Sequence, residues 1–195
     1  AVGVRDFYAL TSLTLCGFVG GSVVLEFVRG IAARRRTSAE SVVVALATLL
    51  AKSRRRYGGY LVHVAMVMLF VGFTGNAFSV DREIVLQQGQ SATVDDYTIT
   101  FQTLAFGDDD SKSVSAAELT LAQDGEFLAT LVPERHLYKK AQQTTTEVSI
   151  YSSWFEDFYI ILVGFADDNA SAKFQIYVNP LVGCVWWGAA LFVVR

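Results

Sequence analysis

The chain has 195 residues, of which 52% are hydrophobic and 18% are charged, and its formal net charge is −3. Its mean hydropathy of +0.37 is high for a soluble protein. The charged fraction is nevertheless too large for a chain that lies wholly within a membrane. The composition therefore excludes one uniform domain of either kind.

The charges are segregated along the chain. Eight of the sixteen Lys and Arg lie between Arg29 and Arg56, and sixteen of the nineteen Asp and Glu lie between Asp81 and Asp168. Short loops that stay in the cytoplasm collect Lys and Arg beside hydrophobic spans. We therefore predict a cytoplasmic basic segment and an extracytoplasmic acidic one. Apolar stretches flank the basic run on both sides, which favours a membrane protein over a nucleic-acid-binding one.

The chain begins AVGVRDFYAL, without an initiator Met or the pattern of a signal peptide, so we expect it to start within a longer protein. The two cysteines, Cys16 and Cys184, lie in apolar stretches and form no CxxC motif. This spacing predicts lone buried thiols and neither a disulfide framework nor a zinc site.

Residues 1–30 predict a transmembrane helix, because the apolar run 7–28 is interrupted only by Glu26 and is long enough to cross about 30 Å of hydrocarbon. Residues 31–56 predict a cytoplasmic basic loop that contains an amphipathic surface helix. Thr37 and Glu40 have the spacing of a capping box before that helix. Its expected apolar face consists of Val42, Val43, Leu46, Leu49 and Leu50.

Residues 57–79 predict a second transmembrane helix, since the 22 residues 57–78 carry no formal charge apart from a single histidine that can ionise. Residues 179–195 begin with Asn-Pro and continue as a short apolar run. We expect this run to form a C-terminal transmembrane helix that is either short or truncated. In this predicted order of spans, the region between the second and the C-terminal helix begins and ends on the extracytoplasmic side.

Residues 80–178 predict an extracytoplasmic β-rich domain. Seven short runs alternate in polarity and read as strands: EIVLQQG, DYTITFQTL, AAELTLA, EFLATLV, EVSIYSS, FYIILVGF and AKFQIYV. Asp124-Gly125 between two of them is a strong hairpin signal, and residues 107–113 read as a solvated loop. The expected fold is an integral membrane α-helical protein with an inserted β-rich domain, a small sandwich or barrel.

His63 lies inside the second predicted span, about 10 Å from its basic end at the rise of an α-helix. Polar groups at that depth are costly and usually face a bundle interior or a cofactor. The residues alone leave open an interhelical hydrogen bond, haem ligation, and proton transfer or another metal. Gly59, Met66 and Val67 are one turn away on the same face and would border a bound group.

Three segments resemble the CcmF family of membrane proteins of cytochrome c maturation. They are RRRYGGYLVHVAMVMLFVGFTGNAF, PERHLYKKAQQTTTEVSIYSSWFEDFYIIL and AKFQIYVNPLVGCVWWGA, in the family's order. The resemblance implies a haem lyase system that attaches haem to the CxxCH of apocytochrome c. It also implies that His63 is one axial ligand of a haem b within the membrane, with Gly59 giving room and Met66 apolar contact.

The resemblance covers only the family's C-terminal portion. The family's tryptophan-rich motif, its partner membrane histidine and two external histidines have no counterpart in this sequence, so we do not expect this piece to be active alone. The implied partners are apocytochrome c, other maturation subunits including the rest of a CcmF-like protein, membrane lipid, and quinol as an electron source. The implied location is the bacterial inner membrane, multi-pass, with the β domain periplasmic; the mitochondrial inner membrane is the alternative.

Other residues have simpler interpretations. Arg54, Arg55 and Arg56 are explained by cytoplasmic anchoring, with haem propionates as a second option. Trp186 and Trp187 suit an aromatic belt. We expect His136 to be an exposed surface histidine, with contact to haem or substrate as a second option. We expect Glu134, Arg135 and Glu147 to brace or solvate a turn.

Two rival functions remain from the sequence. The chain could be a cofactor-free, membrane-anchored docking subunit of an assembly complex, or it could form a proton pathway through His63. The middle span lacks a second buried ionisable residue, which argues against the proton pathway.

Overall fold

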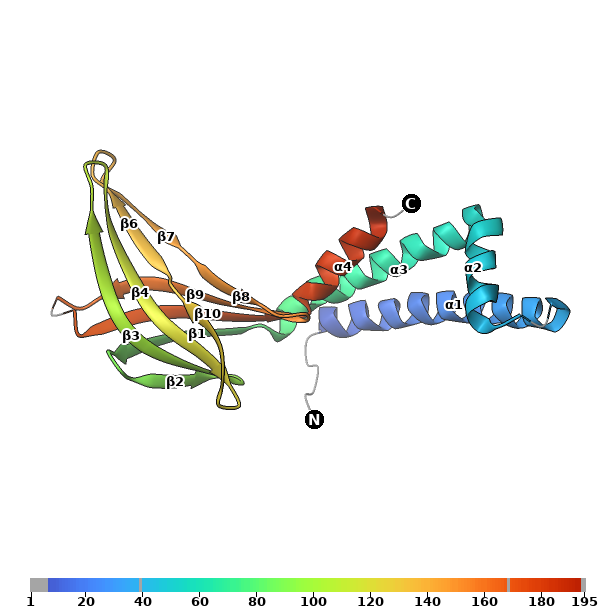
Figure 1. Ribbon diagram of the computed structural model, residues 1–195, viewed down its shortest axis with the longest axis horizontal. Coiled ribbons are helices and arrows are strands. Elements are labelled where there is room, and N and C mark those ends of the chain that lie inside the picture. The colour runs from blue at the N-terminus through green and yellow to red at the C-terminus, as the bar shows by residue number, and fades with distance from the viewer. Residues whose placement is uncertain (1–6, 39, 168, 194–195) are drawn as a thin grey trace. The chain divides into compact units, whose positions relative to one another are not determined.

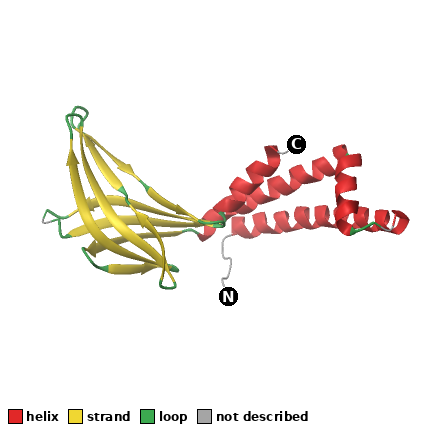
Figure 2. Ribbon diagram, viewed as in Figure 1, coloured by secondary structure: helices red, strands yellow, loops and turns green. Residues whose placement is uncertain are grey.

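The computed structural model describes residues 7–38, 40–167 and 169–193 (Figure 1). The chain divides into two compact units, Ala1–Phe78 with Pro180–Arg195, and Ser79–Asn179. Helices make up the first and strands the second, as Figure 2 shows. We call them the helical unit and the β unit and describe each by itself.

The helical unit contains α1 (Phe7–Ser38), α2 (Val42–Lys52), α3 (Arg54–Thr74), the 3-10 helix η1 (Gly75–Phe78) and α4 (Val182–Val193). Two segments, Phe7–Ser38 and Arg54–Phe78, are long and apolar enough to cross a membrane. The apolar α4 has 12 residues, whereas a span needs about 20. The structure therefore confirms the predicted combination of helices long and apolar enough to cross a membrane with a β-rich domain.

The predicted capping box is wrong. Helix α1 continues through the arginine triplet to Ser38, so Thr37 is inside it and its hydroxyl donates to the Ala33 carbonyl oxygen. Alanine and arginine are good helix formers, which extends α1 beyond its apolar run. Glu40 instead pairs with Arg34, with 2.7 Å between Arg34 Nε and Glu40 Oε2. Residues 31–38 are therefore helix.

Helix α2 begins one residue after Ser41, whose hydroxyl accepts a hydrogen bond from the Val44 backbone N–H. Serine is a favoured N-cap because it satisfies one of the free N–H groups of the first turn. The buried face of α2 is centred on Ala45, whereas Val42 and Val43 are exposed. The apolar repeat therefore lies on a helix, as predicted.

Among its described residues, 79–167 and 169–179, the β unit contains ten strands in two sheets. One sheet has the order β1-β10-β9-β8, and the other has β2-β3-β4-β6-β7 with β5 also paired to β4. The strands are β1 (Val80–Gln87), β2 (Ser91–Val94), β3 (Tyr97–Asp108), β4 (Lys112–Gln123), β5 (Glu126–Leu131), β6 (Glu134–Tyr138), β7 (Gln143–Glu147), β8 (Ser149–Ser152), β9 (Glu156–Phe165) and β10 (Ser171–Pro180).

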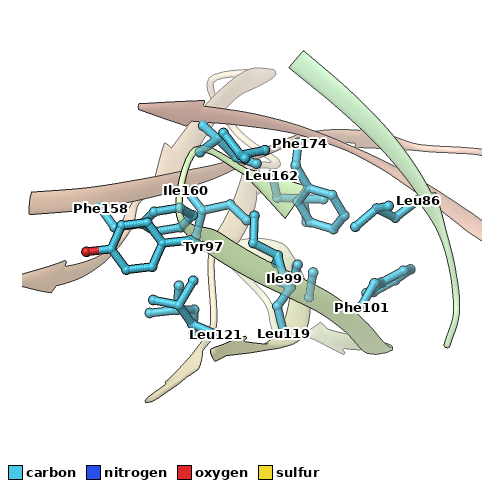
Figure 3. Close-up of a cluster of buried hydrophobic side chains, with 14 of the residues drawn as sticks. Leu86, Tyr97, Ile99, Phe101, Leu119, Leu121, Phe158, Ile160, Leu162 and Phe174 are labelled. Carbon is cyan, nitrogen blue, oxygen red and sulfur yellow. The ribbon is translucent and has the colours of Figure 1, made fainter. Parts of the chain in front are cut away.

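The core of the β unit lies between the two sheets. Alternate residues of β10 are buried, because successive side chains of a strand point to opposite faces. Ile160 and Phe174 from one sheet meet Ile99 and Phe101 from the other in one buried cluster (Figure 3). The Phe101 and Phe174 rings are 5.4 Å apart, edge to face. Such a two-sheet core defines a sandwich.

The predicted hairpin at Asp124-Gly125 is confirmed. Both residues have positive φ, 51° and 82°, between β4 and β5. All seven predicted runs contribute to strands, but β2, β6 and β7 were missed. The expected loop 107–113 is a tight turn, because β3 extends to Asp108 and β4 begins at Lys112. In that turn, Asp109 Oδ1 accepts hydrogen bonds from Ser111 and from the Lys112 backbone.

Candidate functional site

Helix α3 packs against α1 on one side. The Ser12 and Thr74 hydroxyl oxygens are 2.7 Å apart, and the Cys16 thiol lies 3.9 Å from the Val67 carbonyl oxygen. At the basic end, Arg56 Nη2 is 2.5 Å from Glu26 Oε2, which also accepts a hydrogen bond from the Tyr60 hydroxyl. These contacts fix which side of α3 is turned toward α1.

A second side of α3 packs against α4 through glycines. A Cβ at Gly188 would lie 2.9 Å from the Ala65 carbonyl oxygen and 3.1 Å from the Leu69 backbone nitrogen. A Cβ at Gly72 would collide with Val185 and would lie 2.9 Å from its backbone nitrogen. Small residues of this kind let two helices approach backbone to backbone. Ala65 of α3, whose carbonyl oxygen faces Gly188 of α4, is fully buried.

The remaining side of α3 is exposed in the described part of the chain, and we call it the His63 face. It carries an imidazole among large apolar side chains: Val62, His63, Met66, Phe70 and Phe73. Phe70 and Phe73 are 51% and 63% exposed. Their spacing of three and four residues aligns them along one stripe of an α-helix. A stripe this apolar suits contact with lipid, with further helices or with an apolar cofactor.

The imidazole of His63 is held in a defined orientation. Its Nδ1 lies 2.8 Å from the Gly59 carbonyl oxygen. A carbonyl oxygen only accepts, so Nδ1 carries a proton, and in a neutral imidazole Nε2 then keeps its lone pair. Metal-binding histidines generally donate their other ring N–H to a carbonyl or carboxylate in this way. The side chain is exposed, so Nε2 is available to a group outside this chain.

The other residues predicted around His63 divide between two sides of the helix. A Cβ added at Gly59 would meet no atom within 4 Å, and Met66 is 40% exposed on the His63 face. Both residues therefore leave space beside the imidazole. Val67 instead faces α1, where its side chain lies 3.9 Å from the position of a Cβ at Gly20.

These residues fit a haem that receives one ligand from this chain. A neutral imidazole nitrogen is a common axial ligand of haem iron, and apolar side chains suit the porphyrin. Among residues 7–38, 40–167 and 169–193, no group of three or more His, Cys, Asp and Glu could hold a metal ion.

Of the three arginines before His63, one contacts other side chains and two are exposed. Arg56 bonds Glu26 of α1 and lies with its guanidinium carbon 5.9 Å from the centroids of both the Tyr57 and Tyr60 rings. Arg54 and Arg55 are exposed. A Cβ at Gly30 would collide with the Tyr57 hydroxyl, so close packing and the ion pair together join the basic ends of α1 and α3.

The prediction that His136 is exposed is wrong. His136 lies on β6 and is only 7% exposed. Its Nε2 is 2.7 Å from Glu134 Oε2 and its Nδ1 is 3.5 Å from Lys112 Nζ. An ammonium only donates, so Nδ1 accepts and the Nε2 proton goes to the carboxylate. Both ring nitrogens therefore have protein partners.

Glu134 and Glu147 are directly opposite each other on β6 and β7, and Arg135 is the cross-strand neighbour of Thr146. These charged residues thus belong to paired strands and not to a turn. The Thr145 hydroxyl oxygen, opposite His136, is buried without a hydrogen-bond partner among the described residues.

Both cysteines are free thiols; Cys16 is buried and Cys184 is half-buried. Trp186 and Trp187 are 71% and 50% exposed on α4, as suits an aromatic belt. The sequence interpretation missed two features: the exposed aromatic residues at positions 70 and 73, and the pair Trp154 and Phe155 at a strand turn. The three- and four-residue spacing from His63 could have identified the first.

Comparison with known proteins begins in the β unit. The family described as the CcmF C-terminal beta-sandwich matches residues 77–180, more than half of the chain. The chain belongs to the CcmF family. The match includes all ten strands of the β unit.

Two CcmF-family relatives extend the similarity beyond the sandwich. The cytochrome c-type biogenesis protein CcmF of Haemophilus influenzae is 29% identical over 157 residues, 80% of this chain and 24% of that protein. The cytochrome c-type biogenesis protein ccl1 of Rhodobacter capsulatus is 26% identical over 144 residues, 73% of this chain and 22% of that protein. The chain thus spans about a quarter of the length of these relatives.

A solved CcmF structure shares the fold. The chain titled "Cytochrome c Heme Lyase CcmF" aligns with a TM-score of 0.61 and 17% identity, over 88% of this chain and 32% of the other. At that identity the likeness concerns the fold alone.

Proposed function

We propose that this chain acts in cytochrome c maturation as the C-terminal part of a CcmF-type haem lyase system, with His63 as one axial ligand of a membrane haem b. The second ligand comes from a segment outside this chain. The relatives carry names of cytochrome c-type biogenesis proteins, and the chain spans only about a quarter of each. The partner ligand would come from the part of a CcmF-like protein that this chain does not contain.

The observation that supports the proposal most is the hydrogen bond from His63 Nδ1 to the Gly59 carbonyl oxygen. It fixes the tautomer that leaves Nε2 as a donor of electron density to iron, and it limits rotation of the ring. The exposed Met66 and Phe70 beside it supply apolar contact. A buried imidazole with both nitrogens hydrogen-bonded, such as His136, would have no free nitrogen to coordinate iron.

A bound haem of this kind would supply a one-electron couple between ferric and ferrous iron. This chain's own residues hold the imidazole in one orientation, surround it with apolar side chains and leave Gly59 open. The Glu26, Arg56 and Tyr60 network fixes α3 against α1 and thereby sets the depth of His63. None of these roles requires a catalytic side chain on this chain.

The proposed setting is a bacterial inner membrane crossed by α1, α3 and, with further residues or partners, α4. The basic residues between Arg29 and Arg56 would be cytoplasmic and the β unit periplasmic. There the β unit would meet apocytochrome c or other maturation subunits, and quinol in the membrane would supply electrons.

The test is a reduced-minus-oxidised optical spectrum of the chain purified with the remainder of its CcmF system. We expect a b-type signal that is lost in His63→Ala and retained in His136→Ala, because His136 has both nitrogens engaged. Assembly of both variants is checked by co-purification. A colourless wild-type complex that assembles normally would instead support a cofactor-free docking subunit.

A further inference from the structure

Two large aromatic residues occupy a turn of the β unit where polar residues are usual. Trp154 and Phe155 are each 70% exposed, between β8 and β9. Turns generally select Gly, Asn, Asp, Ser and Pro, since these residues favour the backbone conformation or bond it locally. Tryptophan and phenylalanine offer neither advantage to a turn. Their exposure at this position therefore indicates a contact outside the β unit.

The turn is tightly closed, which keeps the two aromatic residues at its tip. The Ser153 backbone N–H donates to the Glu156 carbonyl oxygen at 2.8 Å. The Ser153 hydroxyl oxygen accepts from the Glu156 backbone N–H at 3.1 Å. Ser152 and Asp157 form the last pair of the β8–β9 ladder. Trp154 and Phe155 are therefore the two central residues of a four-residue turn.

The carboxylates that follow the tip are turned into the β unit. Glu156 Oε1 accepts a 2.7 Å hydrogen bond from the Tyr97 hydroxyl, and Asp157 is only 6% exposed. The two residues before the tip, Ser152 and Ser153, are neutral. Within residues 152–157 the turn therefore presents two exposed apolar rings and no exposed charge, which suits the level of a bilayer interface.

The turn lies at the end of the sheet where the chain passes between the two units. β9 and β10 are both ten residues long and form a hairpin closed by Ala166 and Ser171. Their free ends, Glu156 and Pro180, therefore lie at the same end. Val80 of β1 pairs with Val178 of β10 at that end. In Figure 1, β1, β8 and β10 converge there.

Helical residues adjoin this end of the sheet directly. Phe78 ends the candidate membrane segment two residues before Val80, and α4 begins two residues after Pro180. We propose that the Trp154–Phe155 turn inserts at headgroup level into the bilayer and seats this end of the β unit on the membrane surface. The inference rests on the proposed membrane location of α3. Aromatic side chains, tryptophan above all, concentrate at that depth.

Depth-dependent fluorescence quenching in vesicles of phosphatidylcholine and phosphatidylglycerol tests this directly. The chain has three tryptophans, and the double variant Trp186→Phe/Trp187→Phe leaves only Trp154. We expect its emission to shift to the blue in vesicles. Lipids brominated near the headgroup should quench it more strongly than lipids brominated near the chain ends.

Two matched variants make the result decisive. Trp154→Phe retains only the two tryptophans of α4, whose quenching reports whether α4 is in the membrane. Asp167→Trp in a background lacking the other tryptophans places a reporter at the opposite end of the β9–β10 hairpin, where we expect no quenching.

Unquenched Trp154 beside quenched α4 tryptophans would overturn the lipid contact and assign the tip to a protein surface. Unquenched α4 tryptophans would overturn the membrane location of α4, and an unquenched Trp154 beside them would overturn the lipid contact as well. Quenching of Trp154 and of the Asp167→Trp reporter to the same extent would also contradict the proposal, since it would indicate adsorption of the whole β unit.

Discussion

The hydroxyl of Tyr97 in β3 donates a 2.7 Å hydrogen bond to the carboxylate of Glu156 in β9, which joins the two sheets of the sandwich. Tyr97 is only 2% exposed, and its ring is 5.1 Å from that of Phe158. Burial, together with the neighbouring carboxylate, raises the pKa of Tyr97 well above its ordinary value. The hydroxyl therefore remains protonated and able to donate throughout the physiological range.

Tyr97→Phe should lower the free energy of unfolding of the β unit by about 1–3 kcal/mol, because a hydrogen bond to a charged acceptor is lost. Chemical denaturation followed by near-ultraviolet circular dichroism measures the change. Tyr138→Phe, on a side chain that is 38% exposed, is the matched control and should cost little. Equal stability of the two variants would show that the Tyr97 hydrogen bond contributes nothing net.

Asp109 should give the β3–β4 turn a pH dependence. Hydrogen bonds from the Ser111 hydroxyl and from the Lys112 and Ser111 backbone N–H groups lower the pKa of Asp109 from 3.8 to about 2. A carboxylate with a lowered folded-state pKa stabilises the fold above its unfolded pKa. That contribution is lost as the pH falls through the folded value. Carboxyl NMR titration should place the midpoint near 2.

Asp109→Asn provides the matched comparison for that turn. The variant cannot ionise at this position, so its stability should vary less with pH between 3.8 and about 2 than that of the unchanged chain. An unchanged pH profile would show that the turn hydrogen bonds do not favour the ionised carboxylate.

The glycine contact between α3 and α4 predicts a contrast between two positions of one helix. Gly72→Ala should destabilise the pair by about 1–3 kcal/mol, since its Cβ collides with Val185. Gly58→Ala has open space and should be neutral or stabilise α3 by up to about 1 kcal/mol. Thermal unfolding in detergent and the labelling rate of Cys184 measure the difference. Faster labelling in Gly58→Ala than in Gly72→Ala would contradict the packing.

The open space at Gly59 predicts a selective loss of haem. Gly59→Leu should reduce the b-type signal of the assembled system severalfold, because the new side chain fills the space beside His63. Gly58→Leu is the matched control, since a Cβ there also meets no atom within 4 Å but lies one turn from Val62 and not from His63. Loss of the signal in both variants would point to a general effect on α3.

The sequence predicted the features that depend on strong local patterns. The uncharged run before residue 79 and the Asp124-Gly125 turn each have one dominant signal, the hydrophobic length and the requirement for positive φ. The long alternating runs of β9 and β10 were equally clear, because their core positions recur every second residue.

The missed strands lack such a signal. β7 has the sequence QTTTE, without any apolar alternation. β2 alternates but has only four residues, too few for a clear signal. Both form because a neighbouring strand offers an unpaired edge. The burial of His136 depends in the same way on register, since Lys112 reaches it only after β4 and β6 pair. Sequence spacing cannot supply such tertiary pairings.

Only part of the candidate site could likewise be predicted from the sequence. Depth in the span identified His63 from the sequence, and helical spacing placed Gly59 and Met66 beside it. The side of α3 that packs on α1 and α4 depends on interhelical contacts, such as Gly188 against Ala65. Val67 was therefore predicted at the cofactor, although it faces α1.

The central claim is that His63 Nε2 ligates haem iron, and electron paramagnetic resonance of the ferric complex tests it most directly. With imidazoles on both faces, the iron should give a low-spin spectrum. His63→Gly should convert it to high spin, and added imidazole should restore the low-spin signal by entering the vacated position. A low-spin spectrum that is unchanged in His63→Gly without added imidazole would contradict the claim.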